Sequence, residues 1–535
     1  MKNASDYLSA MTIIKGRAVQ AVYRKPECPD HVGNLLIEAL PPILTDDQVI
    51  SRLSYYPKYQ EAQRKEPAHI RYLLIQNGLK FFAPLDVHID IQRRFSNLLR
   101  IGYAGRNPMR NDFWRNLNAS LDSFDQYSDQ YEQQPDHLPS TAAGFNIIGP
   151  SGVGKSFSVE RILSIIPQVI HHNRYRGRDF THSQLVWLKL DCPFDGNLRG
   201  LCLQFFKAVD SILGTNYYRD YTRKRLIQDA LLLEMANVAA SHFLGVLVID
   251  EIQRLSLAKS GGADLMLNCF VQLISIIGVP VVLIGNYKAL PVLSGDFSQI
   301  RRGTGQGDLI WDLMEKDDQW ELFVESLWRF QYTKKKRPAS YINKSSKNPS
   351  TLSDVLYEET QGITDFAVKV YMFAQERAID SGQEIVTAAI IRSAAKDKLR
   401  IPREVLQALK TMDKRVLERY EDLYYKLFKS YLYQQPEDVQ ATGKINSAPE
   451  IKILHEPPSP DEQPKSAVAE DKRPTSLNGR KKTLGKIKKG PPRPSISGEL
   501  PEIVAALETG DGTDAYDALK QAGHIRSSGE YLTSQ

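Results

Sequence analysis

The sequence predicts an α/β fold with a five-stranded parallel sheet, followed by an all-helical region, and three observations lead to this prediction. Apolar strand-like runs alternate with helical patterns from Ile101 to about Tyr332, which is typical of a parallel sheet covered by helices. A glycine-rich sequence of the phosphate-binding type joins the first of these runs to a helix. Residues 351 to about 430 have helical periodicity almost throughout, with Phe366, Val370, Phe373 and Ala374 on one helix face.

Five short apolar runs are expected to form the sheet. The run at 244–250 ends in two carboxylates. The run at 185–192 lies between it and the phosphate-binding sequence, so we expect it to form an extra strand between those two strands. The runs are "GFNIIG" (144–149), "LVWLKLDC" (185–192), "LGVLVID" (244–250), "VPVVLIG" (279–285) and "RFQYT" (329–333).

The phosphate-binding sequence is "GPSGVGKS" (149–156), which fits the P-loop pattern. It follows a strand and opens a helix with an apolar face, so backbone N–H groups and the helix N-terminus can surround phosphate oxygens. Lys155 can reach the β- and γ-phosphates, and the Ser156 hydroxyl can coordinate Mg²⁺. The expected ATP-binding residues are Gly149, Pro150, Ser151, Gly152, Val153, Gly154, Lys155 and Ser156.

Polar residues end two of the expected strands. Asp250 is expected to hold Mg²⁺, and Glu251 to orient and activate the attacking water; the alternative for this pair is a helix cap after the strand. Asn286 ends the next strand and could hold the same water, or it could simply cap the following turn.

With these motifs in this order, the chain resembles the AAA+ ATPases. The resemblance implies that an arginine after the Asn286 strand reaches the nucleotide of a neighbouring subunit. Arg301 and Arg302, in "SQIRRGTGQGD", stand in that order, and a guanidinium suits the charge that develops in phosphoryl transfer. A homo-oligomer, either a ring or a helical filament, would follow; the alternative is that the pair binds nucleic-acid phosphate or a surface carboxylate.

Longer strings resemble TnsC, the ATP-dependent regulator of cut-and-paste transposons that use a dedicated target selector; some relatives work with CRISPR effectors. The strings are "GNLLIEALPP" (33–42), "GYAGRNP" (102–108), "VLVIDEIQRLS" (246–256), "SGGADLMLNCFVQLISIIGVPVVLIG" (260–285) and "RRGTGQGDLIWD" (301–312). This resemblance covers roughly residues 15 to 425. It implies ATP and Mg²⁺ as cofactors and an oligomer around double-stranded DNA. It also implies recruitment by a TniQ/TnsD-type selector, activation of a TnsA/TnsB-type transposase, and disassembly on hydrolysis.

The resemblance also bears on single residues. Tyr103 or Arg106 would contact the adenine side of the nucleotide, although a plain structured loop is an equal alternative. One departure from the family is Asp365 in "QGITDFAVK", at a place where many AAA+ lids have an arginine. The lid contact is then absent, or Lys369 or another residue replaces it.

A nonspecific duplex binder needs Lys and Arg for phosphates rather than side chains that read bases. By family analogy the candidates are Arg199, Arg219, Arg223 and Lys224, and the alternative is a solvated surface. Two further basic segments, 333–350 and 472–494, have six and nine basic residues and no acid. The first is an additional contact or an exposed loop, and the second a disordered tether or a solubilising linker.

The expected domains are an N-terminal arm that contacts the selector (1–100), the ATPase core (101–345), a helical lid (346–435), a disordered basic linker (436–500) and C-terminal transposase-docking motifs (501–535). The net charge of +6 is weak evidence for an anionic partner, and the four cysteines are expected to be buried and reduced. No apolar run approaches the ~20 residues of a membrane helix, so a bacterial cytoplasmic location is expected. The alternative functions are a replication initiator or helicase loader, and a signalling NTPase switch that does not act on DNA.

Overall fold

We describe a computed structural model of the chain, and the residues that it describes are 13–110, 112–115, 117–118, 142–224, 226–258, 262–293, 305–342, 349–417 and 419–420. Arg301 and Arg302, the basic segment 472–494 and the expected docking motifs at 501–535 lie outside these residues. The predictions for them are therefore not tested by the structure.

The central sheet has five parallel strands in the order β5-β6-β7-β2-β8, which confirms the predicted fold class. Four of the five predicted runs form strands: β2 (Phe145–Ile148), β5 (Trp187–Asp191), β6 (Val246–Asp250) and β7 (Val281–Gly285). The prediction for 329–333 is wrong, because Phe330 and Tyr332 are buried in a different core and the fifth strand is β8 (Leu309–Ile310).

The order of the strands corrects a second expectation. The strand between β2 and β6 is β7, whereas β5 lies at the edge of the sheet. Asp250 at the end of β6 and Asn286 after β7 are consequently on neighbouring strands, and the P-loop follows the strand on the other side of β7.

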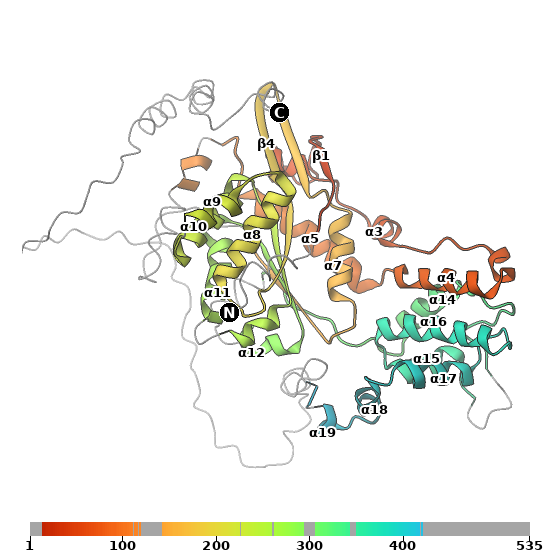
Figure 1. Ribbon diagram of the computed structural model, residues 1–535. Coiled ribbons are helices and arrows are strands. Elements are labelled where there is room, and N and C mark those ends of the chain that lie inside the picture. The colour runs from red at the N-terminus through yellow and green to blue at the C-terminus, as the bar shows by residue number, and fades with distance from the viewer. Residues whose placement is uncertain are drawn as a thin grey trace, which may run out of the picture. The chain divides into compact units, whose positions relative to one another are not determined.

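Helices cover both faces of this sheet (Figure 1). The helices α8 (Leu198–Leu213), α10 (Gln228–Ser241) and α11 (Gly262–Gln272) share one apolar core with Leu247 and Ile249. On the other face, α5 (Asp86–Ala104) and α7 (Lys155–Ser164) pack with Val246 and Val248. The alternation along β6 is what a strand covered on both faces requires.

A second, smaller sheet, formed mainly by the two strands that follow α7, was not predicted. It has the order β1-β3-β4, with β1 (Ala18–Gln20) parallel to β3 (Val169–Tyr175) and β4 (Arg178–Leu185) antiparallel to β3. Arg176 and Gly177 make the turn of the hairpin, with φ angles of 48° and 85°. The many polar residues in β3 and β4 hide this hairpin from an analysis of apolar runs.

The region that was expected to form a helical lid is helical over its described part. It contains α15 (Leu352–Thr360), α16 (Thr364–Asp380), α17 (Ala388–Lys398), α18 (Arg403–Thr411) and α19 (Lys414–Leu417). Val370 and Ala374 are fully buried, while Phe366 and Phe373 are partly buried at the edge of the same core.

Two segments outside the expected lid boundary of 346 belong to the same apolar core. One is α14 (Asp318–Trp328), with Trp320 and Phe323, and the other is α4 (Ala68–Gln76), with Ile75. The start of α5 is shared: Leu85 packs in the lid core, and from Ile91 onward α5 packs in the core of the sheet. The N-terminal hundred residues are therefore divided between the core of the helical region and the core of the central sheet.

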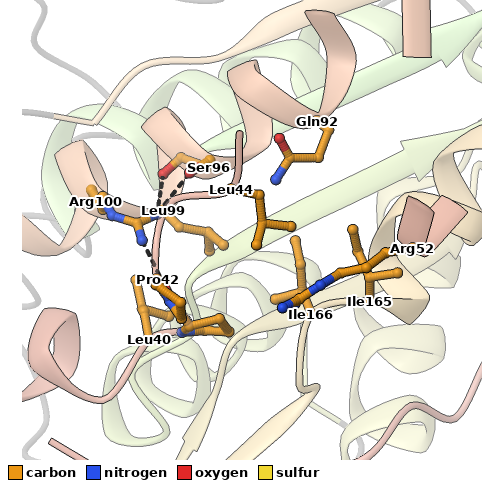
Figure 2. Close-up of a pocket in the computed structure, with 11 residues that line it drawn as sticks. Leu40, Pro42, Leu44, Arg52, Gln92, Ser96, Leu99, Arg100, Ile165 and Ile166 are labelled. Carbon is orange, nitrogen blue, oxygen red and sulfur yellow. Dashed lines mark hydrogen bonds between the residues drawn. The ribbon is translucent and has the colours of Figure 1, made fainter. Parts of the chain in front are cut away.

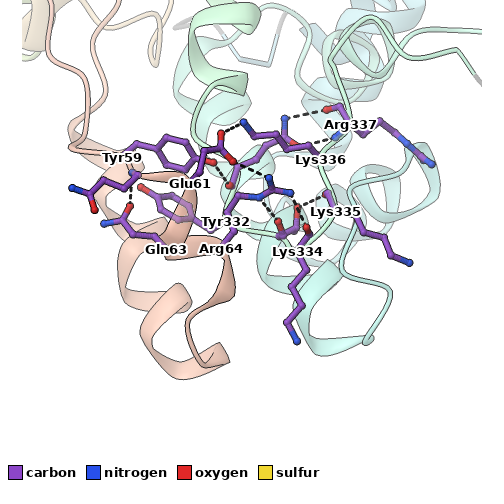
Figure 3. Close-up of polar contacts among 12 residues, drawn as sticks. Tyr59, Glu61, Gln63, Arg64, Tyr332, Lys334, Lys335, Lys336 and Arg337 are labelled. Carbon is purple, nitrogen blue, oxygen red and sulfur yellow. Dashed lines mark hydrogen bonds and ion pairs between the residues drawn. The ribbon is translucent and has the colours of Figure 1, made fainter.

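Two arginines connect this N-terminal segment to the lid: Arg64, which is partly buried (Figure 3), and Arg71, which is buried. Arg64 donates to the carbonyl oxygens of Thr333 and Lys334. Arg71 donates to the Tyr332 carbonyl and to both carboxylate oxygens of Glu384, at 2.7 Å each. The basic turn at Lys334–Arg337 is thus held by backbone contacts while Lys334 and Lys335 are exposed.

The other helices of the described residues are short. They are η1 (Pro29–His31), α2 (Leu35–Glu38), α3 (Asp46–Leu53), η2 (Glu61–Lys65), η3 (Asn77–Lys80), α9 (Tyr217–Arg223), η4 (Ile252–Leu257), η5 (Leu273–Ile277), η6 (Tyr287–Ala289) and α12 (Leu290–Leu293). No helix within the described ranges is long and apolar enough to cross a membrane. Of the four cysteines, Cys192, Cys202 and Cys269 are buried, but Cys28 is exposed, contrary to expectation.

Candidate nucleotide site

The P-loop needs glycine at three positions for two physical reasons. Gly152 and Gly154 have φ angles of 90° and 99°, a backbone conformation that other residues rarely adopt. Gly149 lies against the chain after β8, and a Cβ there would stand 1.9 Å from the Trp311 carbonyl oxygen. The loop is therefore shaped by its own backbone and by the edge strand.

Lys155 is at the first position of α7, next to the loop. Its ammonium donates to the carbonyl oxygens of Gly149 and Pro150, each at 2.7 Å. These acceptors hold the ammonium within the loop, and a phosphate would offer it a charged acceptor in the same place. The predicted role of Lys155 is consistent with this position.

Asp250 is buried at the end of β6 beside a lysine that was not predicted to contact it. The Lys189 ammonium, on the neighbouring strand β5, lies 2.9 Å from Asp250 Oδ2. The backbone N–H of Glu251 donates to Oδ1. Burial opposes the charged form of Lys189, but the carboxylates of Asp250, Asp191 and Glu160 outweigh it and raise the pKa of Lys189. A lysine within the apolar run "LVWLKLDC" was the signal for this contact.

Glu251 has a left-handed backbone with a φ angle of 58°, which is uncommon for a residue with a side chain and typical of functional sites. Its carboxylate is half-exposed and accepts a hydrogen bond from Gln253 Nε2 at 2.7 Å. Gln253 Oε1 in turn accepts from the Asn286 backbone N–H at 3.2 Å. Gln253, which the sequence analysis did not single out, thus links the ends of β6 and β7.

Asn286 is buried, and its position agrees with both roles that the sequence indicated, capping the next turn and holding a water molecule. Its side-chain oxygen accepts from the Lys288 N–H and caps η6, as in the capping alternative. Its place directly after β7, beside the strand that ends in Asp250, is also the place expected for a residue that holds water.

The lid meets the P-loop at the start of α16. The Thr364 hydroxyl lies 3.4 Å from the Val153 carbonyl oxygen, and a Cβ on Gly152 would lie 3.2 Å from Ile363 Cγ2. One turn further, Lys369 forms an ion pair with Asp365 at 2.6 Å. Within the described residues, Lys369 is therefore engaged by the aspartate that stands at the expected arginine position.

The expected adenine contacts are corrected by the structure. Tyr103 and Arg106 are buried beside the N-terminal end of β6, where they donate to the carbonyl oxygens of Phe243 and Leu244. Asp250 and the P-loop lie at the other ends of their strands. Burial raises the pKa of Tyr103 to about 12 and lowers that of Arg106 to about 10. Both residues support the fold, in line with the structured-loop alternative.

His88 connects α5 to the helix that follows the P-loop. Its Nδ1 accepts from the Leu85 N–H, and its Nε2 lies 3.0 Å from the Ser158 hydroxyl on α7. Burial lowers the pKa of His88 to about 4, so the ring is neutral at neutral pH.

The candidate DNA-binding residues fall into two groups. Arg219, Arg223 and Lys224 are exposed on α9 and directly after it. Arg199 is half-buried, and its Nη1 donates to the Leu226 carbonyl oxygen at 2.6 Å, so it holds the segment after α9. The three exposed cations remain candidates for phosphate contacts.

A separate small pocket lies between α3, α5 and the end of α7 (Figure 2). Its walls include Leu44, Ile165 and Ile166, and Arg100 donates to Pro41 and Ser96 at its side. Since Ile165 and Ile166 follow the C-terminal end of α7, this pocket is at the opposite end of that helix from the P-loop.

Comparisons with known proteins agree with an ATPase core of this kind. Residues 140–293 match the family model described as an AAA domain. This range contains the P-loop, Asp250, Glu251 and Asn286, so the chain contains an AAA domain. No curated protein matches the chain.

Among solved structures, the chain is similar to three archaeal proteins at low identity. The Walker-type ATPase of Pyrococcus abyssi is 12% identical, over 56% of this chain and 74% of that one, with a TM-score of 0.29. Cdc6p of Pyrobaculum aerophilum is 13% identical over 54% and 67%, with a TM-score of 0.32. ORC2 of Aeropyrum pernix, in ADPNP and ADP complexes, is 12% identical over 54% and 68%, with a TM-score of 0.31.

Proposed function

We propose that this protein is a TnsC-type AAA+ ATPase, which assembles on double-stranded DNA with ATP and regulates transposition. The observation that carries the proposal is the convergence of the P-loop, the Asp250–Glu251 strand end and Asn286 at one edge of the sheet. The long strings shared with the TnsC family support the narrower assignment.

ATP binding and hydrolysis follow from the groups at this edge. Lys155 would exchange its two loop carbonyls for phosphate oxygens of ATP. Ser156 and the buried carboxylate of Asp250 would hold Mg²⁺, which neutralises phosphate charge when it is bound. Glu251 would orient water and accept its proton, and the hydrogen bond from Gln253 to Oε2 would hold the carboxylate in place for this step. Asn286 would orient the same water.

The neighbouring subunit would complete the site. Arg301 and Arg302, which lie outside the described residues, precede β8, and β8 leads into the Trp311 carbonyl that packs against Gly149. An arginine from this segment would reach the nucleotide of an adjacent subunit in a ring or filament, and would make hydrolysis depend on assembly.

DNA would be bound through its phosphates. The exposed cations Arg219, Arg223 and Lys224 would contact the backbone, while Arg199 would hold their segment in place. The basic turn at Lys334–Arg337 would provide an additional contact, since its backbone is already fixed by Arg64 and Arg71. Such contacts give affinity without sequence preference and depend strongly on salt.

The regulatory steps come from the family resemblance. A TniQ/TnsD-type selector would recruit the oligomer through the N-terminal segment, and the C-terminal segment would engage a TnsA/TnsB-type transposase. Hydrolysis of ATP would disassemble the oligomer.

Electron microscopy of the full-length protein with duplex DNA tests this proposal. We expect rings or filaments on DNA with a non-hydrolysable ATP analogue and far fewer with ADP. Absence of any ATP-dependent oligomer on DNA would reject the proposal. Nucleotide-dependent change without DNA binding would instead favour a signalling NTPase.

A further inference from the structure

Lys189 lies at the centre of the charged groups beside the proposed metal site. Its ammonium nitrogen is 2.9 Å from Asp250 Oδ2, 3.2 Å from Glu160 Oε1 and 3.6 Å from Asp191 Oδ1. The three carboxylates come from β6, α7 and the end of β5. The side chains of Lys189 and Asp250 are each 5% exposed, whereas those of Glu160 and Asp191 are 39% and 53% exposed.

Both oxygens of the expected metal ligand are engaged in this arrangement. Oδ1 of Asp250 accepts from the Glu251 N–H, and Oδ2 faces the Lys189 ammonium. A cation therefore already stands against one oxygen of the carboxylate that is proposed to hold Mg²⁺, directly or through water. The ammonium takes the place of a metal ion in balancing a buried carboxylate.

We infer that Lys189 is a positioning residue of the metal site, which holds Asp250 in the nucleotide-free protein and competes with Mg²⁺ for its carboxylate. This inference rests on the proposed function, since Mg²⁺ would arrive there with ATP. Two cations on one carboxylate repel each other, so Lys189 raises the Mg²⁺ concentration at which the metal–nucleotide complex is accepted.

Glu160 and Asp191 give the ammonium an alternative position. Lysine carries three donors and a compact charge on a flexible stem, so it can move toward these two half-exposed carboxylates while remaining paired. Its release from Asp250 then leaves no isolated charge in the protein interior. Glu160 and Asp191 thereby lower the free-energy cost of moving the Lys189 ammonium away from Asp250 when Mg²⁺ binds.

The first test is Lys189→Met in the full-length protein. Binding of a non-hydrolysable ATP analogue is measured by calorimetry over a series of Mg²⁺ concentrations. We expect the half-saturating Mg²⁺ concentration to fall by on the order of tenfold. Lys316→Met, which removes a lysine from its 2.5 Å ion pair with Asp354 on the lid, should leave that concentration unchanged. An unchanged or higher Mg²⁺ requirement in Lys189→Met would overturn the inference.

Melting temperatures provide a readout that a purely structural role would not move. Without metal, Lys189→Met leaves Asp250 unpaired and should melt at a lower temperature than the wild type. We expect Mg²⁺ with the analogue to raise the melting temperature of this variant more than that of the wild type. An equal increase in both proteins would indicate a structural ion pair only.

A second variant keeps the inference testable if Lys189→Met does not fold. Glu160→Gln removes the nearer alternative acceptor on a half-exposed side chain, so the ammonium should stay on Asp250 and the half-saturating Mg²⁺ concentration should rise. Asp195→Asn removes an exposed acid that follows the same strand and controls for the general loss of negative charge. A rise no larger than that of Asp195→Asn would contradict the inference.

The same titrations separate this inference from the proposed function. A wild-type protein that binds no nucleotide at any Mg²⁺ concentration would reject the proposed function itself. Nucleotide binding with identical Mg²⁺ dependence in all variants would reject only the role of Lys189.

Discussion

Two buried ion pairs in this protein are built differently. On the lid, each guanidinium nitrogen of Arg71 has an acceptor: both oxygens of Glu384 and the carbonyls of Glu66 and Tyr332. At the nucleotide site, one ammonium is shared by three carboxylates, and two of these are half-exposed. The first pair is geometrically complete and fastens two segments together. The second can rearrange, as a site that must receive another cation requires.

This difference predicts that substitutions at the two places change different quantities. Changes at the half-exposed carboxylates of Glu160 and Asp191 and at Glu251 should alter nucleotide chemistry with little effect on stability. Changes at the Arg71–Glu384 pair should alter stability with little effect on nucleotide binding.

Glu251→Gln should slow ATP turnover by at least about a hundredfold, because the amide cannot accept a proton from water. The side chain is half-exposed and keeps its shape, so the affinity for ATP and the melting temperature should stay near those of the wild type. Steady-state hydrolysis and nucleotide binding measure this. Turnover at the wild-type rate would remove Glu251 from the catalytic role.

Arg71→Met should lower the free energy of unfolding by about 3–5 kcal/mol, because it leaves the Glu384 carboxylate and two carbonyl groups without their buried partner. Denaturant titration measures the loss, and binding of the ATP analogue below the transition should be unchanged. Arg71→Lys should recover part of the stability, since one ammonium cannot replace a bidentate guanidinium. If nucleotide affinity fell as much as stability, the separation of the two regions would be wrong.

Acidification should weaken the region around the sheets before it weakens the Arg71–Glu384 pair. Burial lowers the pKa values of His88, His172 and His182 to about 4, below the value of about 6.5 for an unfolded chain. The unfolded state then binds more protons, so stability that is complete above pH 6.5 is lost as the pH falls toward 4. One pKa unit is worth about 1.4 kcal/mol, so each of the three histidines should contribute about 3 kcal/mol to this loss.

The lid responds at lower pH. The hydrogen bonds from Arg71 lower the pKa of Glu384 below its ordinary value of 4.5, so the contribution of this pair is present above that value and disappears only as the pH falls further. Melting curves from pH 8 to pH 4, for wild type and His172→Gln, measure the first effect. A flat profile over this range would contradict neutral buried histidines.

Arg93→Ala should change the free energy of unfolding by no more than about 0.5 kcal/mol. Its pair with Asp46 is long, at 3.3 Å, and both side chains are more than half exposed. The change in the free energy of unfolding for this exposed pair serves as the reference for the change measured in Arg71→Met by the same denaturant titration. A loss comparable to that of Arg71→Met would mean that burial does not explain the difference between the pairs.

The sequence predicted the parts of the fold that depend on local pattern. Four strands and the P-loop helix carry long apolar runs or an explicit motif, so their positions were found. β8 has only two residues, and the buried aromatic residues at 329–333 imitated a strand because their partners in the lid are far away in the chain. The β3–β4 hairpin was missed because its residues alternate too little in polarity.

The candidate site was predicted to a similar degree. Residues within motifs, such as Lys155 and Asp250, lie together at one edge of the sheet. Lys189 and Gln253 have no motif, and their roles depend on which strands are neighbours. Tyr103 and Arg106 were predicted at the wrong place because resemblance to a family sequence gives the order of residues along the chain. It does not give the end of the parallel strands at which these residues lie.

The division of α5 between two cores has a mechanical consequence. The chain passes between the core of the central sheet and the core of the lid three times: between Leu53 and Ile75, between Leu85 and Ile91 in α5, and between Trp311 and Trp320. A proteolytic cut in any one of these connections would leave the lid attached by the other two.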